Sequence, residues 1–202
     1  MPDLGYNYFP ADIGVWVVYD VDSIVYNDFT DSVETYNYQI KEIVESAFID
    51  GEGRETRRLE RYIRLTDTLP WSINDVWFAN RTASRAEKVE ENVRFIKLIF
   101  PVKNGALWNG NAANTLGNRD YQYVETNVSM AVGGILFDSV LTVLQRDEDL
   151  GIVKDYFLEK YAKNAGMVYK VAIHLEQDVV DPSWKDPQKG YDLKMTVKSY
   201  GK

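Results

Sequence analysis

The 202-residue chain contains no cysteine and a single histidine, His174. Without cysteine it can form neither a disulfide framework nor a thiolate metal site, and redox chemistry says nothing about its compartment. No stretch approaches the ~18 consecutive apolar residues of a membrane-spanning helix. The chain also lacks the Gly-x-Ser-x-Gly elbow of many serine hydrolases. No motif is therefore left from which a catalytic residue, a bound metal or a cofactor could be assigned.

The net charge of −8 is poorly suited to nucleic acid, because a phosphate backbone would be repelled. The charges are also unevenly distributed. Residues 1–53 contain eleven Asp and Glu against the single Lys41, whereas residues 54–103 contain eleven Lys and Arg against seven Asp and Glu. Since opposite charges across a sheet are favourable, the distribution predicts that the acidic first strands pair with the arginine cluster at 54–64. Alternation splits that cluster, with Arg58 and Arg64 on one face and Arg57 and Arg61 on the other.

The chain is rich in aromatic residues, with 14 Tyr, 8 Phe and 5 Trp, and this composition favours strands. The stretch 6–27 predicts the first strand, because an aromatic-proline start leads into a β-branched run whose two alternating sets are both apolar. Turn composition at 27–32 and 50–53 separates it from later strands. Further strands are predicted at 33–48, 54–66, 75–80, 94–100, 121–128, 135–145, 167–177 and 191–199, and surface loops at 108–118 and 178–190.

Two segments have mixed patterns. Ser84 and Glu87 have the spacing of a capping box, and a helical apolar stripe could follow, but the surrounding strands favour a strand ending near Glu91. Residues 152–163 are compatible with helix or strand. The length suits one β-rich domain spanning 1–202. We therefore expect a mainly β fold, a single antiparallel sheet of roughly nine to eleven strands curved into an open barrel or half-barrel, with room for one or two short helices.

One short pattern occurs twice. Phe9-Pro10 and Phe100-Pro101 are each followed by three residues, a glycine and a nearby tryptophan. Proline removes a ladder donor, glycine permits a tight bend, and the indole can cover that bend. The repeat predicts two similar corners in the chain, not a functional site.

Candidate functional residues are few. His174 and Glu176 would share a strand face, as a base and its orienting partner would. Asp20 and Asp22 project from one face of the first strand, near Asp28 and Asp31 in the next turn, so a calcium site is conceivable. Aspartate is nevertheless common at such turns for conformational reasons, and we assign no metal ligand and no catalytic residue. The candidate binding residues are instead the tryptophans in or near predicted loops, which could form an aromatic rim that stacks on a ligand: Trp71, Trp77, Trp108 and Trp184.

The stretch Tyr8-Phe9-Pro10 with Gly14 and Trp16 resembles the mature N-terminus of uncharacterised Bacteroidetes cell-envelope lipoproteins. Residues 100–111, 134–143 and 161–170 are similar to parts of the same extracytoplasmic β proteins. Chains of this family start just after a lipid-modified cysteine. The resemblance implies a periplasmic or surface-facing protein held to the membrane by a lipid anchor outside this sequence, and it brings no catalytic residues.

These observations favour a non-enzymatic envelope lipoprotein that binds a ligand or protein partner through a curved sheet or a loop rim. A carrier of lipid-like molecules would need an apolar cavity that solvent can reach. Two alternatives stay open. A structural component of an envelope assembly would have a large apolar surface patch in place of a pocket, and a carboxylate-dependent hydrolase would need two acidic side chains converging in a cleft.

Overall fold

The computed structural model describes residues 3–202 and consists almost entirely of one twelve-stranded antiparallel sheet. A short 3-10 helix, η1 (Tyr6–Tyr8), precedes the strands. The strands are β1 (Trp16–Asn27), β2 (Ser32–Ile49), β3 (Glu55–Arg64), β4 (Ser72–Arg81), β5 (Arg85–Glu90), β6 (Val93–Ile99), β7 (Leu107–Asn109), β8 (Asp120–Val132), β9 (Ile135–Asp149), β10 (Val153–Ala162), β11 (Gly166–Glu176) and β12 (Lys189–Gly201). Their order is β6-β5-β4-β3-β2-β1-β12-β11-β10-β9-β8-β7. Strands consecutive in the chain are therefore neighbours in the sheet, except that a loop joins β6 to β7 at opposite ends of the order; the first and last strands, β1 and β12, also pair with each other.

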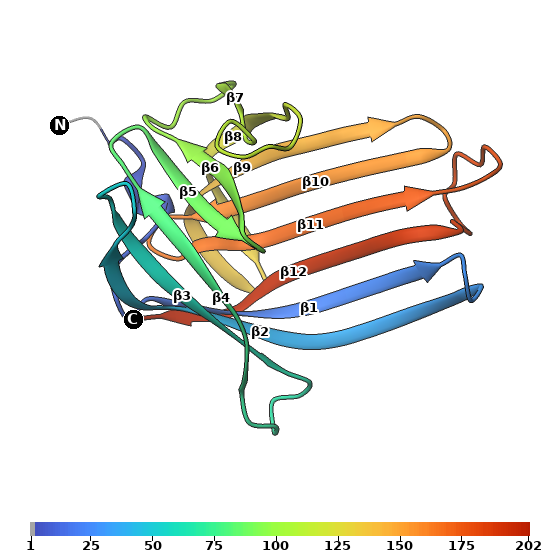
Figure 1. The fold of residues 1–202 in the computed structure, drawn as a ribbon, viewed down its shortest axis with the longest axis horizontal. Helices are drawn as coiled ribbons and strands as arrows, with labels where there is room; N and C mark the ends of the chain where they lie inside the picture. The colour runs from blue at the N-terminus through green and yellow to red at the C-terminus, as the bar shows by residue number, and fades with distance from the viewer. Residues whose placement is uncertain (1–2) are drawn as a thin grey trace.

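The sheet curls until its two ends meet, forming a nearly closed barrel at one end of the molecule (Figure 1). Strands β1, β2 and β9–β12 are longer than the barrel and continue beyond it. We call this extension the shelf, comprising residues 22–27, 32–37, 146–149, 153–157, 172–176 and 189–193. Figure 1 shows the β1–β2, β9–β10 and β11–β12 connections together at the far end of the shelf, opposite the C-terminus and the start of the chain.

The barrel has one seam without a strand ladder, between β6 and β7. The Ile96 N–H donates to the Gly110 carbonyl across it at 2.8 Å, and the Trp108 indole N–H donates to the Ile96 carbonyl at 2.9 Å. The Tyr123 hydroxyl accepts from the Ile99 N–H and donates to the Ile99 carbonyl. Side-chain groups thus satisfy an edge strand that would otherwise be left with unpaired peptide groups.

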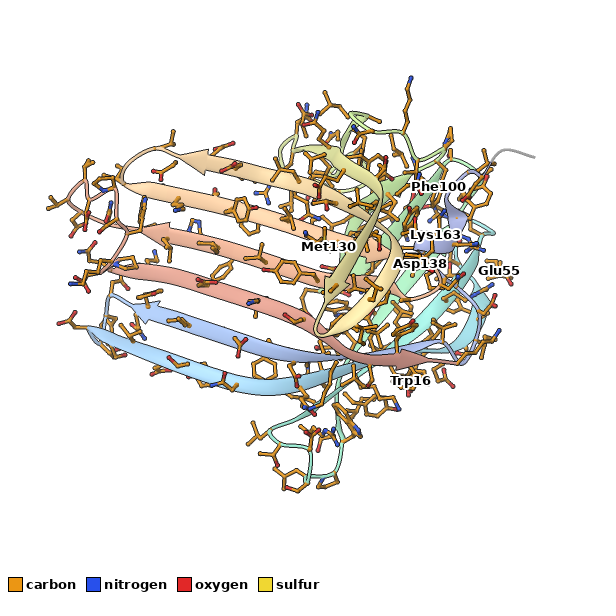
Figure 2. The ribbon with its side chains drawn as sticks, turned by 180° about the vertical axis from the view of Figure 1, so that it is seen from behind. Trp16, Glu55, Phe100, Met130, Asp138 and Lys163 are labelled. Carbon is orange, nitrogen blue, oxygen red and sulfur yellow. The ribbon has the colours of Figure 1, made fainter. Side chains whose placement is uncertain are left out.

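The β8–β9 hairpin forms a second layer outside the sheet. Its tip at Gly133 packs so closely on β12 that an added Cβ would lie 1.9 Å from the Val197 carbonyl oxygen, and Phe137 packs on Tyr200 with ring centroids 5.5 Å apart. Figure 2 shows Met130 on the part of β8 that crosses the outside of the sheet. One part of the sheet is consequently covered on both faces, whereas most of the shelf is a single layer.

The barrel end away from the shelf is closed by the N-terminal segment. Tyr8 is 1% exposed and belongs to an aromatic-rich core with Trp108, Tyr121 and Tyr123. Asn164 donates its N–H to the Asn7 carbonyl at 2.8 Å, which ties the segment to the β10–β11 turn. The barrel is therefore a cup that opens toward the shelf.

The predicted fold class is confirmed, with more strands than expected. Residues 107–109 form the short strand β7, which overlaps the start of the loop predicted at 108–118, because they pair with β8. The segment 84–93 contains the predicted strand, β5, which ends at Glu90, and residues 152–163 form β10. The first strand begins at Trp16, so the prediction of strand over residues 6–15 is wrong: Pro10 and the bend at Gly14 keep this part out of the ladder.

The predicted pairing of acidic and basic strands is also confirmed. Glu45 contacts Arg58 at 3.0 Å and Glu42 contacts Arg61 at 3.3 Å between β2 and β3. The two predicted corners share their geometry as well. Gly14 and Gly105 have φ of 90° and 78°, and the N–H of each donates at 2.8 Å to a strand carbonyl.

Candidate functional site

The inner face of the barrel carries a network of buried ion pairs. Lys97 on β6 lies 2.7 Å from Glu159 on β10 and 3.2 Å from Glu90 at the end of β5. Lys170 on β11 lies 3.7 Å from Glu159 and 3.9 Å from Glu90. The Tyr161 hydroxyl donates to Glu159 at 2.6 Å. The side chains of Lys97 and Glu159 are 4% and 1% exposed, so this pair is shielded from water.

A second set of charges adjoins the first, nearer β2 and β4. Glu42 accepts from Lys88 at 2.7 Å and lies 3.3 Å from Arg61, which also contacts Asp75 at 3.1 Å. The Arg61 guanidinium stacks on Trp77, 3.6 Å from the ring centroid. The two sets together contain four cations and four anions, so the interior is close to charge balance. Charged groups in a low-dielectric interior require such pairing, because burial of an unpaired charge would destabilise the folded protein by roughly several kcal/mol.

The buried lysine and glutamates remain ionised. Burial would raise the pKa of Glu90, but Lys97, Lys170 and Lys88 outweigh that effect and hold the pKa well below its usual range. Glu159 behaves in the same way, with its pKa lowered by Lys97 and Lys170 against the effect of burial. Burial likewise favours neutral Lys97, yet the two glutamates raise its pKa. At neutral pH neither glutamate has a proton to give.

Two cavities lie along the inside of the barrel. The inner cavity, about 60 Å³, is bounded by the N-terminal residues Phe9 to Ala11 and by Val17 and Leu59. The mouth cavity, about 220 Å³, lies toward the shelf and is lined by Trp77, Arg61, Tyr38, Lys170 and Leu193, among others. Glu42, Lys88 and Met167 line both cavities and so separate them. The mouth cavity is therefore lined by aromatic and apolar side chains and by charged side chains that neutralise one another.

His174 stands on the same concave face, farther out on the shelf. Its Nδ1 lies 2.6 Å from Asp155 and its Nε2 lies 3.1 Å from Glu176. The second oxygen of Asp155 contacts Arg146 at 2.9 Å, and Tyr191 lies beside the imidazole. The hydrogen bond to Asp155 raises the pKa of His174, and Glu176 adds to this against the opposing effect of partial burial. The expectation that His174 and Glu176 share a face is confirmed. The sequence did not identify Asp155, the third residue of β10, as a partner of His174.

The four tryptophans predicted as an aromatic rim lie in different surroundings. Trp77 lines the mouth cavity. Trp71 is the residue before β4, and the Arg64 guanidinium stacks on it, 4.3 Å from the ring centroid. Trp108 is buried at the seam, and Trp184 is buried in the β11–β12 loop with its indole N–H donated to Asp149 at 2.9 Å. The structure therefore does not bring the four together, and Trp77 is the one that faces the cup.

Of the aspartates considered as calcium ligands, Asp20 contacts other side chains. Asp20 accepts from Gln39 at 2.7 Å and lies 3.4 Å from Lys198. Within residues 3–202, no group of three or more His, Asp or Glu side chains is arranged so that it could hold a metal ion. Over the same residues, no helix combines the length and apolar character needed to cross a membrane.

No protein-family model matches the chain, and no curated protein matches its sequence. A crystal structure described as a "putative lipoprotein" from Parabacteroides distasonis ATCC 8503 is similar in structure, with a TM-score of 0.40 and 10% identity, covering 96% of this chain and 98% of that one. A likeness this distant does not show a family.

The inner-face charges were not singled out from the sequence. Lys88 and Glu90, like Glu159 and Tyr161, occur at spacing two within their strands, which places each pair on one face. That spacing is equally common on a solvated face. Only the curvature, which brings β5 and β6 opposite β10 and β11, shows that these charges are inside.

Proposed function

We propose that this protein is a non-enzymatic binding protein of the cell envelope, and that a small ligand enters the mouth cavity from the shelf. The observation that carries the proposal is the mouth cavity itself: about 220 Å³, at the open end of a cup whose other end is closed. A cavity of about 150 Å³ accommodates benzene, so a somewhat larger molecule would fit. Small-molecule sites in β-barrels commonly occupy such a mouth.

The lining favours a neutral or zwitterionic ligand with an aromatic or sugar-like face. The ionic groups around the cavity already neutralise one another, so a ligand with net charge would have to displace an existing ion pair. Lys170 is the exception. Its ammonium makes only long contacts, 3.7 and 3.9 Å, with its two glutamates and can donate to a polar group of the ligand.

The other two uses of the interior have less support. A lipid-like ligand needs a large apolar cavity, whereas the more apolar inner cavity is only about 60 Å³. A carboxylate-dependent hydrolase needs a carboxyl group that stays protonated near neutral pH. Glu90 and Glu159 have lowered pKa values because of Lys97 and Lys170, so they cannot act as general acids.

The binding test uses two matched tryptophan variants. Compounds retained by protein isolated from its natural source are identified by native mass spectrometry, and their affinity is then measured by calorimetry. Trp77→Phe is expected to weaken binding about tenfold or more, as expected for a central aromatic contact. Trp71→Phe also loses an arginine-stacked indole, but outside the cavity, and should bind as the parent does. Equal affinities for the two variants would contradict a ligand site in the mouth cavity.

The envelope location rests on the sequence resemblance. The same mass spectrum tests it, since a lipid anchor adds the mass of its acyl chains to the intact protein. A mass without acyl chains, together with recovery from the cytosol, would contradict the location while leaving the binding proposal intact.

A second candidate function is binding of a protein partner through the distal loops. Six large apolar side chains are exposed there at 48–93%: Phe29, Val33, Leu150, Ile152, Val179 and Val180. Residues 27–34, 146–154 and 176–189 also contain ten Asp and Glu against four Lys and Arg. A basic surface with apolar residues would complement this rim. A photocrosslinker at Phe29 should capture a partner in intact cells, and one at Ile49, which is 66% exposed at the opposite end of β2, should not.

A further inference from the structure

The outside of the sheet carries a groove that the proposed ligand site does not use. It measures about 490 Å³ and runs between the outer layer and the outer face of β10–β12. One wall is made by four consecutive residues of the β8–β9 hairpin, 130–133. Three of them, 130–132, belong to β8, and because successive side chains of a strand point to opposite faces, three consecutive residues can line one groove only if the strand presents its edge.

That edge of β8 has no neighbouring strand. β8 pairs along its length with β9, but on its other side it pairs with β7 only through Asp120–Gln122, while Tyr123 exchanges hydrogen bonds with the backbone at 105–106. At the tip, Val132 pairs with Ile135 across a two-residue Gly-Gly turn. The residues that flank such a turn bond to each other, so Ala131 directs its N–H and C=O away from β9 and into the groove.

The floor of the groove is suited to side chains of an added strand. Tyr156, Leu158, Tyr169 and Val171 supply an apolar surface from every second residue of β10 and β11. Val128 and Leu136 at the hairpin are 37% and 69% exposed, so the hairpin is not itself covered by another element. Figure 2 shows the open face of the sheet continuing beside the strand that carries Met130.

The charges of the groove favour an acidic occupant. Lys160 and Lys194 line the floor, and neither has a carboxylate within ion-pair distance among residues 3–202; the Lys160 ammonium contacts the Met130 sulfur at 3.1 Å. Two carboxylates lie near Lys194 without an ion-pair contact to it: Asp22 is its partner on β1, and Asp192 lies two residues away on the same face, where burial raises the pKa of Asp192 more than Lys194 lowers it. Two unpaired lysines are notable on a chain whose net charge is −8, and they disfavour a basic peptide.

We propose that the free edge of β8 binds an extended acidic peptide segment of a protein partner by strand addition. The peptide main chain would pair with β8 around Ala131, and its inward side chains would alternate between the apolar floor and the two lysines. A second copy of this chain is disfavoured, because a two-fold contact through this edge would bring two basic grooves together.

The test uses three synthetic peptides of about nine residues, a typical strand length. The first alternates Glu and Val, the second alternates Lys and Val, and the third is the first with every second amide N-methylated. Binding is followed by fluorescence anisotropy at low ionic strength, and hydrogen exchange of the Ala131 amide is measured by NMR. The Glu/Val peptide should bind saturably below about 1 mM and slow exchange at Ala131, whereas the other two should bind at least about tenfold more weakly.

Variants of the protein test the contribution of the β8 edge and that of the two lysines on the groove floor separately. Ala131→Pro removes the N–H that points into the groove and keeps the hydrogen bonds between β8 and β9. It should therefore abolish strand addition. Lys160→Glu with Lys194→Glu should weaken the Glu/Val peptide about tenfold or more. The charge-matched control, Lys103→Glu with Lys185→Glu, changes two exposed lysines outside the groove and should bind as the parent does.

Three binding results would each overturn the proposal. These are equal binding of the N-methylated peptide, equal loss in the groove and control charge variants, or no binding of the Glu/Val peptide at about 1 mM. Concentration-dependent doubling of the mass with protection of Ala131 would also overturn it, since the edge would then pair with a second copy. If Ala131→Pro fails to fold, the charge variants and the N-methylated peptide still decide.

Discussion

Lys97 is the residue on which the interior charge network depends, because its ammonium is the closest cation to both Glu159 and Glu90. A buried ion pair adds little to stability by comparison with well-packed apolar side chains, but removal of one partner leaves the other charge uncompensated. The network therefore constrains the sequence more than it stabilises the fold.

Lys97→Met is expected to destabilise the protein by about 3–5 kcal/mol at neutral pH, measured by urea unfolding. Both glutamates have lowered pKa values, so their contribution is present above their ordinary pKa and lost as the pH falls through the lowered values. The difference from the parent should therefore shrink in acid, where the unpaired glutamates of the variant become protonated. Lys103→Met, at an exposed lysine, should change stability by no more than about 0.5 kcal/mol. A similar loss in both variants would argue against the network.

His174 gives a direct test of the shelf geometry, because a single histidine yields one imidazole signal. Its pKa should lie above 6.5, since Asp155 and Glu176 both stabilise the protonated ring. Because the folded-state pKa is raised, the contribution of protonated His174 to the free energy of unfolding is complete below the unfolded pKa of about 6.5 and is lost as the pH rises through the higher folded pKa. Asp155→Asn should lower the pKa toward the ordinary value in an NMR titration, and an unchanged pKa would contradict the 2.6 Å contact.

At the scale of elements, the seam is held by side chains where a ladder would normally continue. Tyr123 is 0% exposed, and its hydroxyl serves both peptide groups of Ile99. Tyr123→Phe should cost about 1–3 kcal/mol, since it leaves the partly buried N–H and C=O of Ile99 without these partners. Hydrogen exchange at Ile99 should accelerate with it. Tyr36→Phe, which removes a hydroxyl on the exposed shelf, is the control and should have little effect.

The β8–β9 hairpin provides a matched pair of glycines. Gly133 and Gly134 both have left-handed φ, 59° and 79°, so alanine adds similar backbone strain of about 1–2 kcal/mol at each. A Cβ at Gly134 meets nothing within 4 Å, whereas one at Gly133 meets the Val197 carbonyl at 1.9 Å. Gly133→Ala should therefore cost at least about 2 kcal/mol more than Gly134→Ala in thermal or urea unfolding. Equal costs would mean that the hairpin does not pack on β12.

At the scale of the molecule, stability should decline from the barrel toward the end of the shelf. Val21 and Met195 pair across β1 and β12 inside the barrel and are 2% and 6% exposed. Val25 and Tyr191 pair four residues farther out, where Tyr191 is 38% exposed and the sheet is a single layer. Amides of the second pair should exchange faster than those of the first, by NMR-detected hydrogen exchange. Equal protection would indicate that the shelf opens only with global unfolding.

Much of the fold could be predicted from local pattern. Alternation identified the long strands β1, β2, β9 and β11, and the glycine turn at 50–53 identified the β2–β3 hairpin. Strand context correctly favoured strand for β5. The first strand starts at Trp16 and not at residue 6, because Pro10 and Gly14 break the ladder there, and the strand β7 was not predicted, because its three residues are held by pairing with β8 and not by their own pattern.

The sequence by itself determined the antiparallel β class, the hairpin order and the pairing of acidic with basic strands, since these depend on interactions between neighbours along the chain. Only the tertiary structure decided which face is inside, because Lys88, Glu90 and Glu159 look like solvated strand residues until curvature brings β5, β6 and β10 together. The same holds for the tryptophans and for the free edge of β8. Both depend on where distant strands end up in space, and no local pattern encodes that placement.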